Sequence, residues 1–393
     1  MRQTRPKHIL LLNTLYPPYS LGGAERSVEI LAKSLLQRGL RISLLTLTEM
    51  GVEAREDVDG VEVYRIPLRN IYWPFIESSH QSSAHRALWH LLDNYNPLQA
   101  KLVGSALDKL QPDIVHTNNL AGFSVAAWRE CANRKVPIIH TARDYYLLHP
   151  NATLHGRNGP QSERSLSSRG WSATKKRASR LVSSFVGISD YVRDIHIRSG
   201  FFKNATNHVI YNSLEAPASR PPRRAFTGTF GFLGRLDPTK GLEVALEAMR
   251  YHENYSLIVA GSGESSYSSH LHSIAPPNVK FIGRQKSDHF FRQIDALIVP
   301  SIWAEPLGRV VIEAYSNGVP VIASRIGGLL DTVNQRTGLH FTPGDSESLA
   351  SCMSTISSSK IDYYSNCISY SLGFSSSEIC DSYFDLYDSM TCM

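Results

Sequence analysis

Short apolar segments alternate with longer amphipathic stretches along most of this chain of 393 residues. Buried strands that alternate with helices are typical of βαβ units, in which the strands run parallel. In the first half of the chain, the predicted strands span residues 8–12, 42–47, 61–66, 114–116, 137–140 and 185–188. Residues 25–38 form a predicted helix that ends at Gly39, a residue suited to the left-handed helix stop. The alternation therefore predicts an α/β fold built on parallel sheets.

The alternation stops at residues 217–224, which hold three prolines and three arginines and no apolar period. Because proline cannot continue a helix, we interpret this segment as a linker. The pattern then restarts, with predicted strands at residues 229–233, 256–260, 279–282, 296–299 and 319–323. The length also suits two domains of about 150 to 200 residues. We expect two Rossmann-like, doubly wound domains, residues 1–216 and 225–373, that face a central cleft and bind ligands at the carboxyl ends of their strands.

Charge is unevenly distributed over the two halves. The whole chain carries a net +6, but residues 1–215 hold 27 Lys and Arg against 18 Asp and Glu, whereas residues 216–393 hold 14 against 17. A basic half favours anionic partners. No recognised nucleic-acid-binding module is present, so nucleic acid is not expected as a partner.

One stretch of the first half, residues 151–184, is rich in serine and basic residues. One interpretation is a solvated loop and helix face; the alternative is a surface that meets an anionic membrane or a phosphorylated acceptor, with Trp171 as an interfacial anchor. The basic residues concerned are Arg157, Arg164, Arg169, Lys175, Lys176, Arg177 and Arg180.

The five cysteines have no metal-binding spacing, and we expect free thiols in a reducing compartment. The apolar run after the basic start, residues 9–12, is too short for a signal-peptide core. No window approaches the roughly 18 to 20 apolar residues that a membrane span needs. We therefore expect a cytoplasmic protein whose membrane contact is peripheral, at the inner membrane face.

The segment from Glu305 to Glu313 carries the strongest chemical signal. Gly308 is predicted to open a helix, and a helix start favours anions through its N–H groups and its dipole. From Gly308 to Glu313 the helix rises about 7.5 Å, at roughly 1.5 Å per residue. Two carboxylates so separated match the sugar and the ribose of a nucleotide-sugar, with the pyrophosphate between them.

Glycine-rich turns follow the first predicted strand of each half. Gly231 to Gly241 holds Gly234 with Arg235 and Lys240, and fixed cations there would stabilise the charge that develops on a leaving diphosphate. Gly263 lies in a turn after the next strand. In the first half, Gly22 and Gly23 leave room for backbone N–H groups to approach a phosphate or an acceptor.

Together these motifs resemble the family 4 glycosyltransferases of the GT-B fold, which retain the anomeric configuration of the transferred sugar. The resemblance runs from about residue 8 to residue 341. It implies that Glu305 contacts the sugar, that Glu313 binds the ribose, and that residues 374–393 form a helix that returns to the first domain. The implied catalytic residues are Arg235, Lys240 and Glu305, and the implied donor-binding residues are Gly22, Gly23, Gly234, Gly263, Leu307, Gly308, Arg309, Val310 and Glu313.

The acceptor side departs from this family pattern. Many members carry His-x-His where this chain has His116, Thr117 and Asn118, and His-Asp where it has Arg143 and Asp144. Asn118 cannot act as a base, although it can hydrogen-bond the sugar or the acceptor, and Asp144 can orient the nucleophile. His116 is either an acceptor-side residue or a packed strand-end histidine.

These observations predict a retaining hexosyltransferase that uses a UDP- or GDP-sugar and a glycan or glycolipid acceptor, as in cell-surface polysaccharide or lipopolysaccharide biosynthesis. Two alternatives share the donor site. One is a catalytically weakened nucleotide-sugar-binding partner subunit, for which Asn118 and Arg143 argue. The other is a GT-B-like nucleotide-sugar epimerase, which would turn over without an acceptor.

We predict that activity needs no metal ion. Asp57 and Asp59 form an Asp-x-Asp pair, but they lie in a polar connection, residues 53–60, without the further ligands that a metal site requires. Turnover measured with and without EDTA is expected to be equal. A strict dependence on Mn²⁺ or Mg²⁺ would contradict this expectation.

Overall fold

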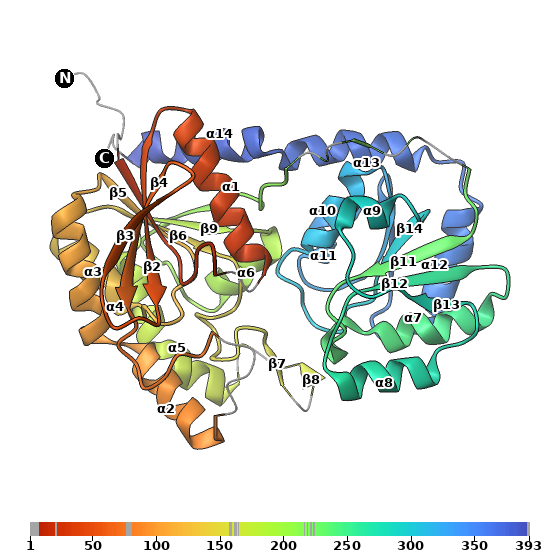
Figure 1. Cartoon of the computed structure of the whole chain (residues 1–393), viewed down its shortest axis with the longest axis horizontal. Coiled ribbons are helices and arrows are strands. Elements are labelled where there is room, and N and C mark those ends of the chain that lie inside the picture. Colours follow the sequence, from red (N-terminus) through yellow and green to blue (C-terminus); the bar gives the residue numbers. More distant parts are fainter. Residues whose placement is uncertain are drawn as a thin grey trace. The chain divides into compact units, whose positions relative to one another are not determined.

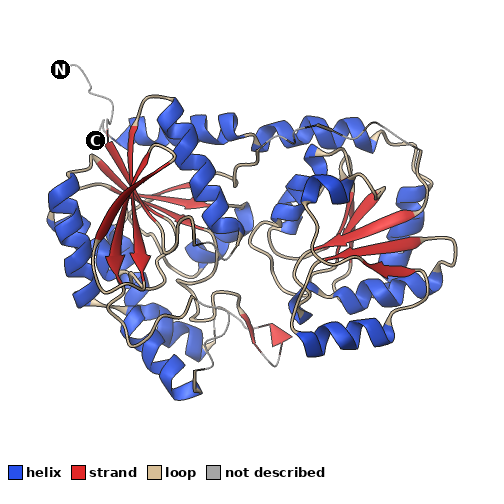
Figure 2. Cartoon of the chain, viewed as in Figure 1, coloured by secondary structure: helices blue, strands red, loops and turns tan. Residues whose placement is uncertain are grey.

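The structure is a computed structural model that describes residues 8–19, 22–75, 81–156, 159–160, 163, 165–215, 217, 219–220, 222 and 225–390. It divides into two compact units (Figures 1 and 2). Unit 1 comprises Met1–Ser213 and Ser376–Met393, and unit 2 comprises Leu214–Ser375. The predicted linker, residues 217–224, thus falls within unit 2 by this division.

Unit 1 contains an eight-stranded sheet with the strand order β10-β9-β6-β5-β1-β2-β4-β3. All neighbouring strands pair in parallel except β3, which is antiparallel to β4. A short antiparallel pair, β7 and β8, forms a second sheet. The strands are β1 (His8–Leu12), β2 (Arg41–Thr48), β3 (Ala54–Val58), β4 (Val61–Pro67), β5 (Ile114–Thr117), β6 (Ile138–Ala142), β7 (His155–Gly156), β8 (Gly159–Pro160), β9 (Ser184–Gly187) and β10 (Thr206–Val209).

Helices connect the parallel strands of unit 1. Helix α1 begins where the Glu25 carboxylate accepts the N–H of Gly22 at 3.1 Å, and the chain leaves it through Gly39 at φ +82°, as predicted. The helices are α1 (Gly23–Gln37), α2 (Ser83–Asn94), α3 (Pro97–Leu110), α4 (Ala126–Asn133), α5 (Leu166–Ala178), the 3₁₀ turn η1 (Ser179–Leu181), α6 (Asp190–Arg198) and α14 (Ser376–Met390).

Unit 2 contains a six-stranded, fully parallel sheet with the order β13-β12-β11-β14-β15-β16. Its strands are β11 (Thr229–Leu233), β12 (Ser256–Ala260), β13 (Val279–Phe281), β14 (Ala296–Val299), β15 (Val321–Ser324) and β16 (Gly338–Phe341). Its helices are η2 (Pro238–Lys240), α7 (Leu242–Ala248), η3 (Met249–Tyr251), α8 (Ser265–Ile274), α9 (Ser287–Phe291), α10 (Arg309–Ser316), α11 (Leu329–Thr332), α12 (Ser346–Ser357), α13 (Tyr363–Ser371) and η4 (Leu372–Phe374).

Both faces of the sheet in unit 2 are buried, because alternate residues of each strand enter different cores. Ile298 packs with α7, α8 and α12, whereas its neighbours Leu297 and Val299 pack with α9, α10, α11 and α13. On strand β15, Ile322 likewise packs in the first of these cores, and its neighbours Val321 and Ala323 pack in the second. This is the doubly wound arrangement that the sequence predicts.

The predicted strands are confirmed, each within two residues of its observed ends. The prediction for residues 53–60 is wrong, because this connection forms β3 and a tight turn into β4. This strand could not be predicted because its residues are almost all exposed and polar, as is possible in an edge strand. At the turn, the Asp57 carboxylate accepts the N–H of Gly60 at 2.9 Å, and Asp59 pairs with Lys33 at 2.8 Å.

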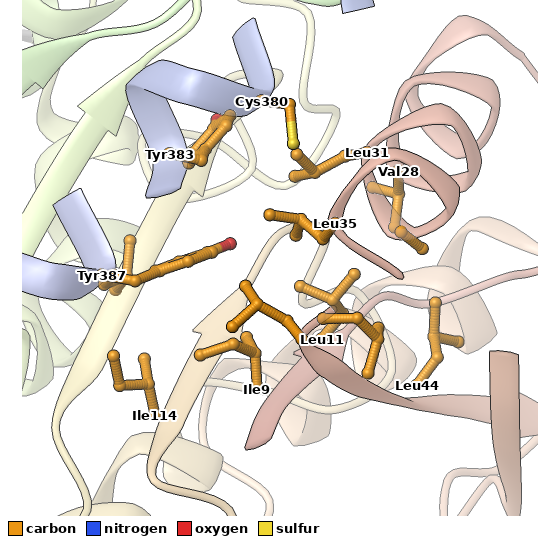
Figure 3. Close-up of a cluster of buried hydrophobic side chains, with 14 of the residues drawn as sticks. Ile9, Leu11, Val28, Leu31, Leu35, Leu44, Ile114, Cys380, Tyr383 and Tyr387 are labelled. Atoms are coloured by element: carbon orange, nitrogen blue, oxygen red, sulfur yellow. The ribbon is translucent and has the colours of Figure 1, made fainter. Parts of the chain in front are cut away.

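The C-terminal helix α14 completes the core of unit 1. It lies beside α1 (Figure 1), and its apolar side chains meet those of α1 and the sheet in one buried cluster. Figure 3 shows Cys380, Tyr383 and Tyr387 of α14 facing Leu31 and Leu35 of α1 and strand residues of the sheet. Residues distant in the sequence thus share one core.

A buried hydrogen-bond network joins α14 to the sheet. The Tyr387 hydroxyl bonds His116 Nδ1 at 2.7 Å, and His116 Nε2 bonds the Thr141 hydroxyl at 2.8 Å. The same Thr141 hydroxyl bonds the Tyr383 hydroxyl at 3.0 Å. Burial, together with the charge of Arg143, lowers the pKa of His116 to about 3, so its imidazole is neutral at physiological pH.

We predict that Tyr387→Phe destabilises unit 1, because it leaves His116 Nδ1 buried without its partner. The expected loss in the free energy of unfolding is about 1 to 3 kcal/mol. Thermal and urea denaturation would measure it, with Tyr251→Phe as the control, since Tyr251 is half exposed. Equal midpoints for the wild type and Tyr387→Phe would contradict the role of this network.

Candidate nucleotide-sugar site

The carboxyl ends of the strands in unit 2 bring the predicted donor residues of this unit to one edge of the sheet. Strand β11 leads into Gly234 and Arg235, and its neighbour β14 leads through Ser301 to Glu305. Because adjacent parallel strands end at the same edge, segments about 70 residues apart along the chain become neighbours.

Lys240 and Glu305 form an ion pair at this edge. Lys240 Nζ lies 2.6 Å from Glu305 Oε1, and the Ser301 hydroxyl donates to the same oxygen at 2.7 Å. Glu305 is buried, with 7% of its surface exposed. Burial alone would raise the pKa of Glu305, but Lys240, Ser301 and Trp303 together lower it below its usual value. The carboxylate is therefore ionised at neutral pH.

The backbone around the ion pair depends on glycine. Gly241 has φ +65°, and a Cβ there would lie 2.1 Å from the carbonyl oxygen of Pro300. Gly328 donates its N–H to the carbonyl oxygen of Glu305 at 2.7 Å, and a Cβ on it would lie 2.2 Å from the carbonyl oxygen of Pro306. These close contacts fix the main chain that carries Lys240 and Glu305.

Glu313 lies on α10, which begins after Gly308 at φ +81°, as predicted. Arg309 Nε lies 2.9 Å from Glu313 Oε1, so the two predicted donor residues form an i, i+4 ion pair on one helical turn. Leu307 is buried and Val310 is half-buried. The side chain of Leu307 therefore belongs to the core.

Arg235 is exposed and lines a cavity of about 240 Å³. Gly234 lines the same cavity, as do Arg284 and Ser262, whose hydroxyl accepts from Arg284 Nε at 2.6 Å. Two guanidinium groups thus border one cavity at the carboxyl edge of the sheet, an arrangement that suits an anionic ligand. Arg284 was not predicted; its position in the loop that follows strand β13 is the one signal in the sequence that points to it.

Gly263 serves the packing of this edge. A Cβ on Gly263 would lie 1.9 Å from the carbonyl oxygen of Leu236, with which Gly263 forms a β-bridge. A second cavity of about 240 Å³ lies at the opposite, amino edge of the same sheet, lined by Phe226, Asp295 and Tyr363 among others. None of the predicted site residues lines it.

The predicted acceptor-side residues lie at the carboxyl edge of the sheet in unit 1. Arg143 is buried; its Nε donates to Asn118 Oδ1 at 3.0 Å and its Nη1 to Asn212 Oδ1. Asp144 accepts the N–H of Tyr146 at 2.8 Å, and burial raises the pKa of Asp144. The structure therefore brings Asn118 and Arg143 together and adds Asn212, which the sequence analysis missed.

Gly22, Gly23 and Glu25 lie at the start of α1, and Glu25 is close enough to Asp144 and Arg143 for their charges to act on its carboxylate. Burial raises the pKa of Glu25, hydrogen bonds from the backbone partly offset this rise, and the charges of Asp144 and Arg143 act on it in opposite directions. Glu25 and Asp144 are therefore electrostatically linked. The Gly22-Gly23-Ala24-Glu25 motif could have identified Glu25 as part of this site.

His116 lies inside the core of unit 1. It is fully buried, and both ring nitrogens are hydrogen-bonded within the core. Of the two interpretations of His116, the packed strand-end histidine is the one that the structure supports.

The basic residues in and around α5 differ in burial. Lys175 is buried, donates to the Tyr146 carbonyl at 2.8 Å and lies over the Tyr146 ring, whereas Arg169, Arg177 and Arg180 are exposed. The prediction that Lys175 belongs to a solvated or membrane-facing surface is therefore wrong, because two nearby carboxylates and a carbonyl hold it inside. Arg157 and Arg164 lie outside the described residues.

Comparison with known proteins decides the family. The family model "Glycosyl transferases group 1" matches residues 225–372, and the model "Glycosyltransferase Family 4" matches residues 21–216. An uncharacterized 42.6 kDa protein in the cps region of Klebsiella pneumoniae is 36% identical over 334 residues, which are 85% of this chain and 89% of that protein. The chain belongs to the family 4, group 1 glycosyltransferases.

Three further proteins are similar over most of the chain. Glycogen synthase of Mycobacterium tuberculosis is 25% identical over 386 residues, covering 88% of this chain and 85% of that enzyme. Sucrose-phosphate synthase from Thermosynechococcus elongatus superposes with a TM-score of 0.76 at 19% identity, covering 98% and 99% of the two chains. Anabaena HepE in complex with UDP superposes with a TM-score of 0.72 at 20% identity, covering 97% and 99%.

These likenesses confirm the predicted fold class, two Rossmann-like domains of the GT-B type. Among the helices that the structure describes, none is long and apolar enough to cross a bilayer. In the described part of this glycosyltransferase, no group of three or more His, Cys, Asp or Glu side chains is placed to hold a metal ion. Its four described cysteines, Cys131, Cys352, Cys367 and Cys380, are free thiols in the structure.

We predict that Lys240→Met destabilises this glycosyltransferase by about 3 kcal/mol at pH 7, because it leaves the Glu305 carboxylate buried without its cation. In the wild type, Glu305 has a lowered pKa, so its contribution to stability is present above its unfolded pKa and is lost as the pH falls through the folded value. Without Lys240, burial is the dominant effect and raises the pKa of Glu305. The variant then carries a buried ionised carboxylate at pH 7, and this cost disappears as the pH falls and the carboxylate takes up a proton.

The difference in unfolding free energy between the wild type and Lys240→Met should therefore shrink from pH 7 toward pH 4.5. Chemical denaturation at several pH values would measure it. The control is Lys240→Met combined with Glu305→Gln, which removes the unpaired charge and should restore part of the loss. A difference that does not change with pH would contradict the ion-pair account.

Proposed function

We propose that this glycosyltransferase transfers a hexose from a UDP- or GDP-linked donor, with retention of the anomeric configuration, to a glycan or glycolipid acceptor. The observation that carries the proposal is the partly buried Lys240–Glu305 ion pair at the carboxyl edge of the sheet in unit 2, the edge that also holds the cavity lined by Arg235 and Arg284. An ionised carboxylate next to cations suits a ligand that joins sugar hydroxyls to a diphosphate.

Each residue has a distinct role in the proposal. Glu305 accepts hydrogen bonds from hydroxyls of the donor sugar, and Glu313 accepts them from the ribose. Lys240 and Arg235 stabilise the negative charge that the diphosphate gains as the bond between the sugar C1 and the phosphate oxygen breaks. Charge that develops in the transition state is thereby stabilised more than the ground state.

The chemistry needs no separate base in unit 1. The acceptor hydroxyl oxygen forms the new bond to C1 on the face from which the phosphate leaves, and its proton passes to the departing phosphate oxygen. Asn118 and Asp144 would then orient the acceptor, while Arg143 is held between Asn118 and Asn212. Because His116 is enclosed in the core, the proposal gives it no part in the reaction.

The similarities favour a polysaccharide pathway. The Klebsiella relative is encoded in the cps region, and lipopolysaccharide outer core galactosyltransferase WaaB superposes with a TM-score of 0.66 at 13% identity. HepE was solved with UDP and with UDP-glucose. We therefore place the reaction in cell-surface polysaccharide or lipopolysaccharide synthesis, at the cytoplasmic face of the membrane, and favour UDP as the carrier.

The donor can be identified by binding before any acceptor is known. Thermal-shift screening against UDP-, GDP- and ADP-sugars should raise the melting temperature for the correct donor, since a ligand that binds the native state stabilises it by mass action. Transfer with the selected donor is then measured on saccharide and lipid-linked acceptors, with the anomeric configuration of the product read by NMR.

We predict that Glu305→Gln lowers the rate of transfer at least about a hundredfold, the scale on which one electrostatic contact at a reacting centre is felt. The variant should still bind the free nucleoside diphosphate, because Arg235, Arg284 and Lys240 are unchanged. Arg336→Gln, on an exposed loop, is the control and should transfer normally. Unchanged transfer by Glu305→Gln, or inversion of configuration at C1, would contradict the proposal. If the wild-type protein bound the nucleotide-sugar without any transfer, the partner-subunit alternative would be favoured. Turnover of the donor without an acceptor would favour the epimerase alternative.

A further inference from the structure

Trp303 contacts both members of the Lys240–Glu305 ion pair. The ammonium group of Lys240 lies over its ring, with Nζ 5.7 Å from the ring centroid, which is a cation–π contact. The indole N–H acts on the Glu305 carboxylate, since Trp303 is one of the groups that lower the pKa of Glu305. Tryptophan suits both contacts, because its ring face attracts cations and its N–H donates to anions. Trp303 is half-buried, so it forms part of the wall around the pair.

The main chain that carries Trp303 is tied to the main chain that carries Lys240. The N–H of Ile302 donates to the carbonyl oxygen of Thr239 at 2.9 Å, and these two residues directly precede Trp303 and Lys240. Thr239 is fixed in turn, because Asp237 Oδ1 accepts its N–H at 2.9 Å. The ring and the ammonium group are therefore held together by the backbone as well as by their own attraction.

The Glu305 carboxylate is fixed from two segments of the chain. Lys240, from η2, is the charged group that acts on it, and Lys240 Nζ meets Oε1 at 2.6 Å. Ser301 and Trp303, from the loop after β14, supply neutral donors, and the Ser301 hydroxyl meets Oε1 at 2.7 Å. Several donors on one carboxylate fix its orientation, and orientation matters most where the group must meet a ligand.

We propose that Trp303 is a positioning residue of the donor site, which holds the Lys240 ammonium and the Glu305 carboxylate in the arrangement that the donor requires. Ser301 assists it on the carboxylate. Trp303 acts through Lys240 and Glu305 and not through contact with the ligand. The identity of that ligand rests on the proposed function, but the contacts of Trp303 exist without it.

The first test needs no substrate. The free energy of unfolding is measured against pH for the wild type and Glu305→Gln, and again with Trp303→Phe in both, so the difference within each pair isolates Glu305. Because the folded pKa of Glu305 is lowered, its contribution to stability is lost as the pH falls through that value. Trp303→Phe removes the N–H and raises that pKa, so the loss should occur at a pH about one unit higher. Equal midpoints in the two pairs would overturn the proposal.

The second test measures transfer with the donor selected by binding. Trp303→Phe should lower kcat about tenfold with little change in the donor KM, because it misplaces groups that act in the transition state. The acid limb of kcat/KM against pH, which reports the carboxylate of the free enzyme, should also move to higher pH. If Glu305→Gln is impaired but Trp303→Phe keeps the wild-type kcat and acid limb, the proposal fails while the proposed function stands. If the wild type transfers no sugar, the proposed function fails, and the first test alone decides the role of Trp303.

Further variants serve as controls. Ser301→Ala removes the other neutral donor and should move both pH midpoints in the same direction as Trp303→Phe. Trp303→Met also lacks the N–H, so it carries the same expectation should Trp303→Phe not fold. Trp171→Phe makes the matched substitution at a half-buried tryptophan of α5 and should behave like the wild type in both tests. A shift of the midpoints by Trp171→Phe as large as that by Trp303→Phe would overturn the proposal.

Discussion

Parallel strand pairing is the constraint on which the rest of this molecule depends. In unit 2 all six strands run the same way, so their carboxyl ends form one edge and both faces of the sheet must be covered by helices. Lys240, which follows β11, meets Glu305, which follows β14, only because those two strands are neighbours. The same pairing in unit 1 brings Asn118, Arg143 and Asn212 together from three different strand ends.

The Lys240–Glu305 pair is a costly feature to keep for stability alone. Desolvation of two charges offsets much of their attraction, and a well-packed apolar pair of similar size is often as stable. Glycines with close backbone contacts, Gly241 and Gly328, hold the main chain on either side of the pair. A partly buried ion pair that is held in this way at the ligand-binding edge of a doubly wound sheet fits a role in binding better than a role in stability.

Much of the fold follows from the sequence, because a strand that is buried on both faces must be apolar throughout. For this reason strands could be predicted at residues 8–12, 229–233 and 296–299, and the structure confirms all three. Strand β3 could not be predicted, since an exposed edge strand carries the polar residues of a loop.

The candidate site follows from the sequence to a smaller extent. Glu305, Gly308 and Glu313 lie within one short segment, so their spacing on the predicted helix could be worked out from the sequence. Arg284 and Asn212 carry no motif, and they join their sites only through strand order. The buried position of Lys175 likewise depends on Asp93 and Tyr146, which lie on other elements. Such contacts are tertiary, and no single stretch of sequence encodes them.

The central claim is that the carboxyl edge of the sheet in unit 2 binds the diphosphate of a nucleotide-sugar. Calorimetric titration with UDP, and with GDP if UDP does not bind, compares the wild type with Arg235→Gln. Arg235 is exposed, so its substitution should leave folding unchanged. The account predicts about a tenfold or greater loss of affinity, as expected when a charged hydrogen bond to phosphate is removed. Equal affinity in the two proteins would contradict it.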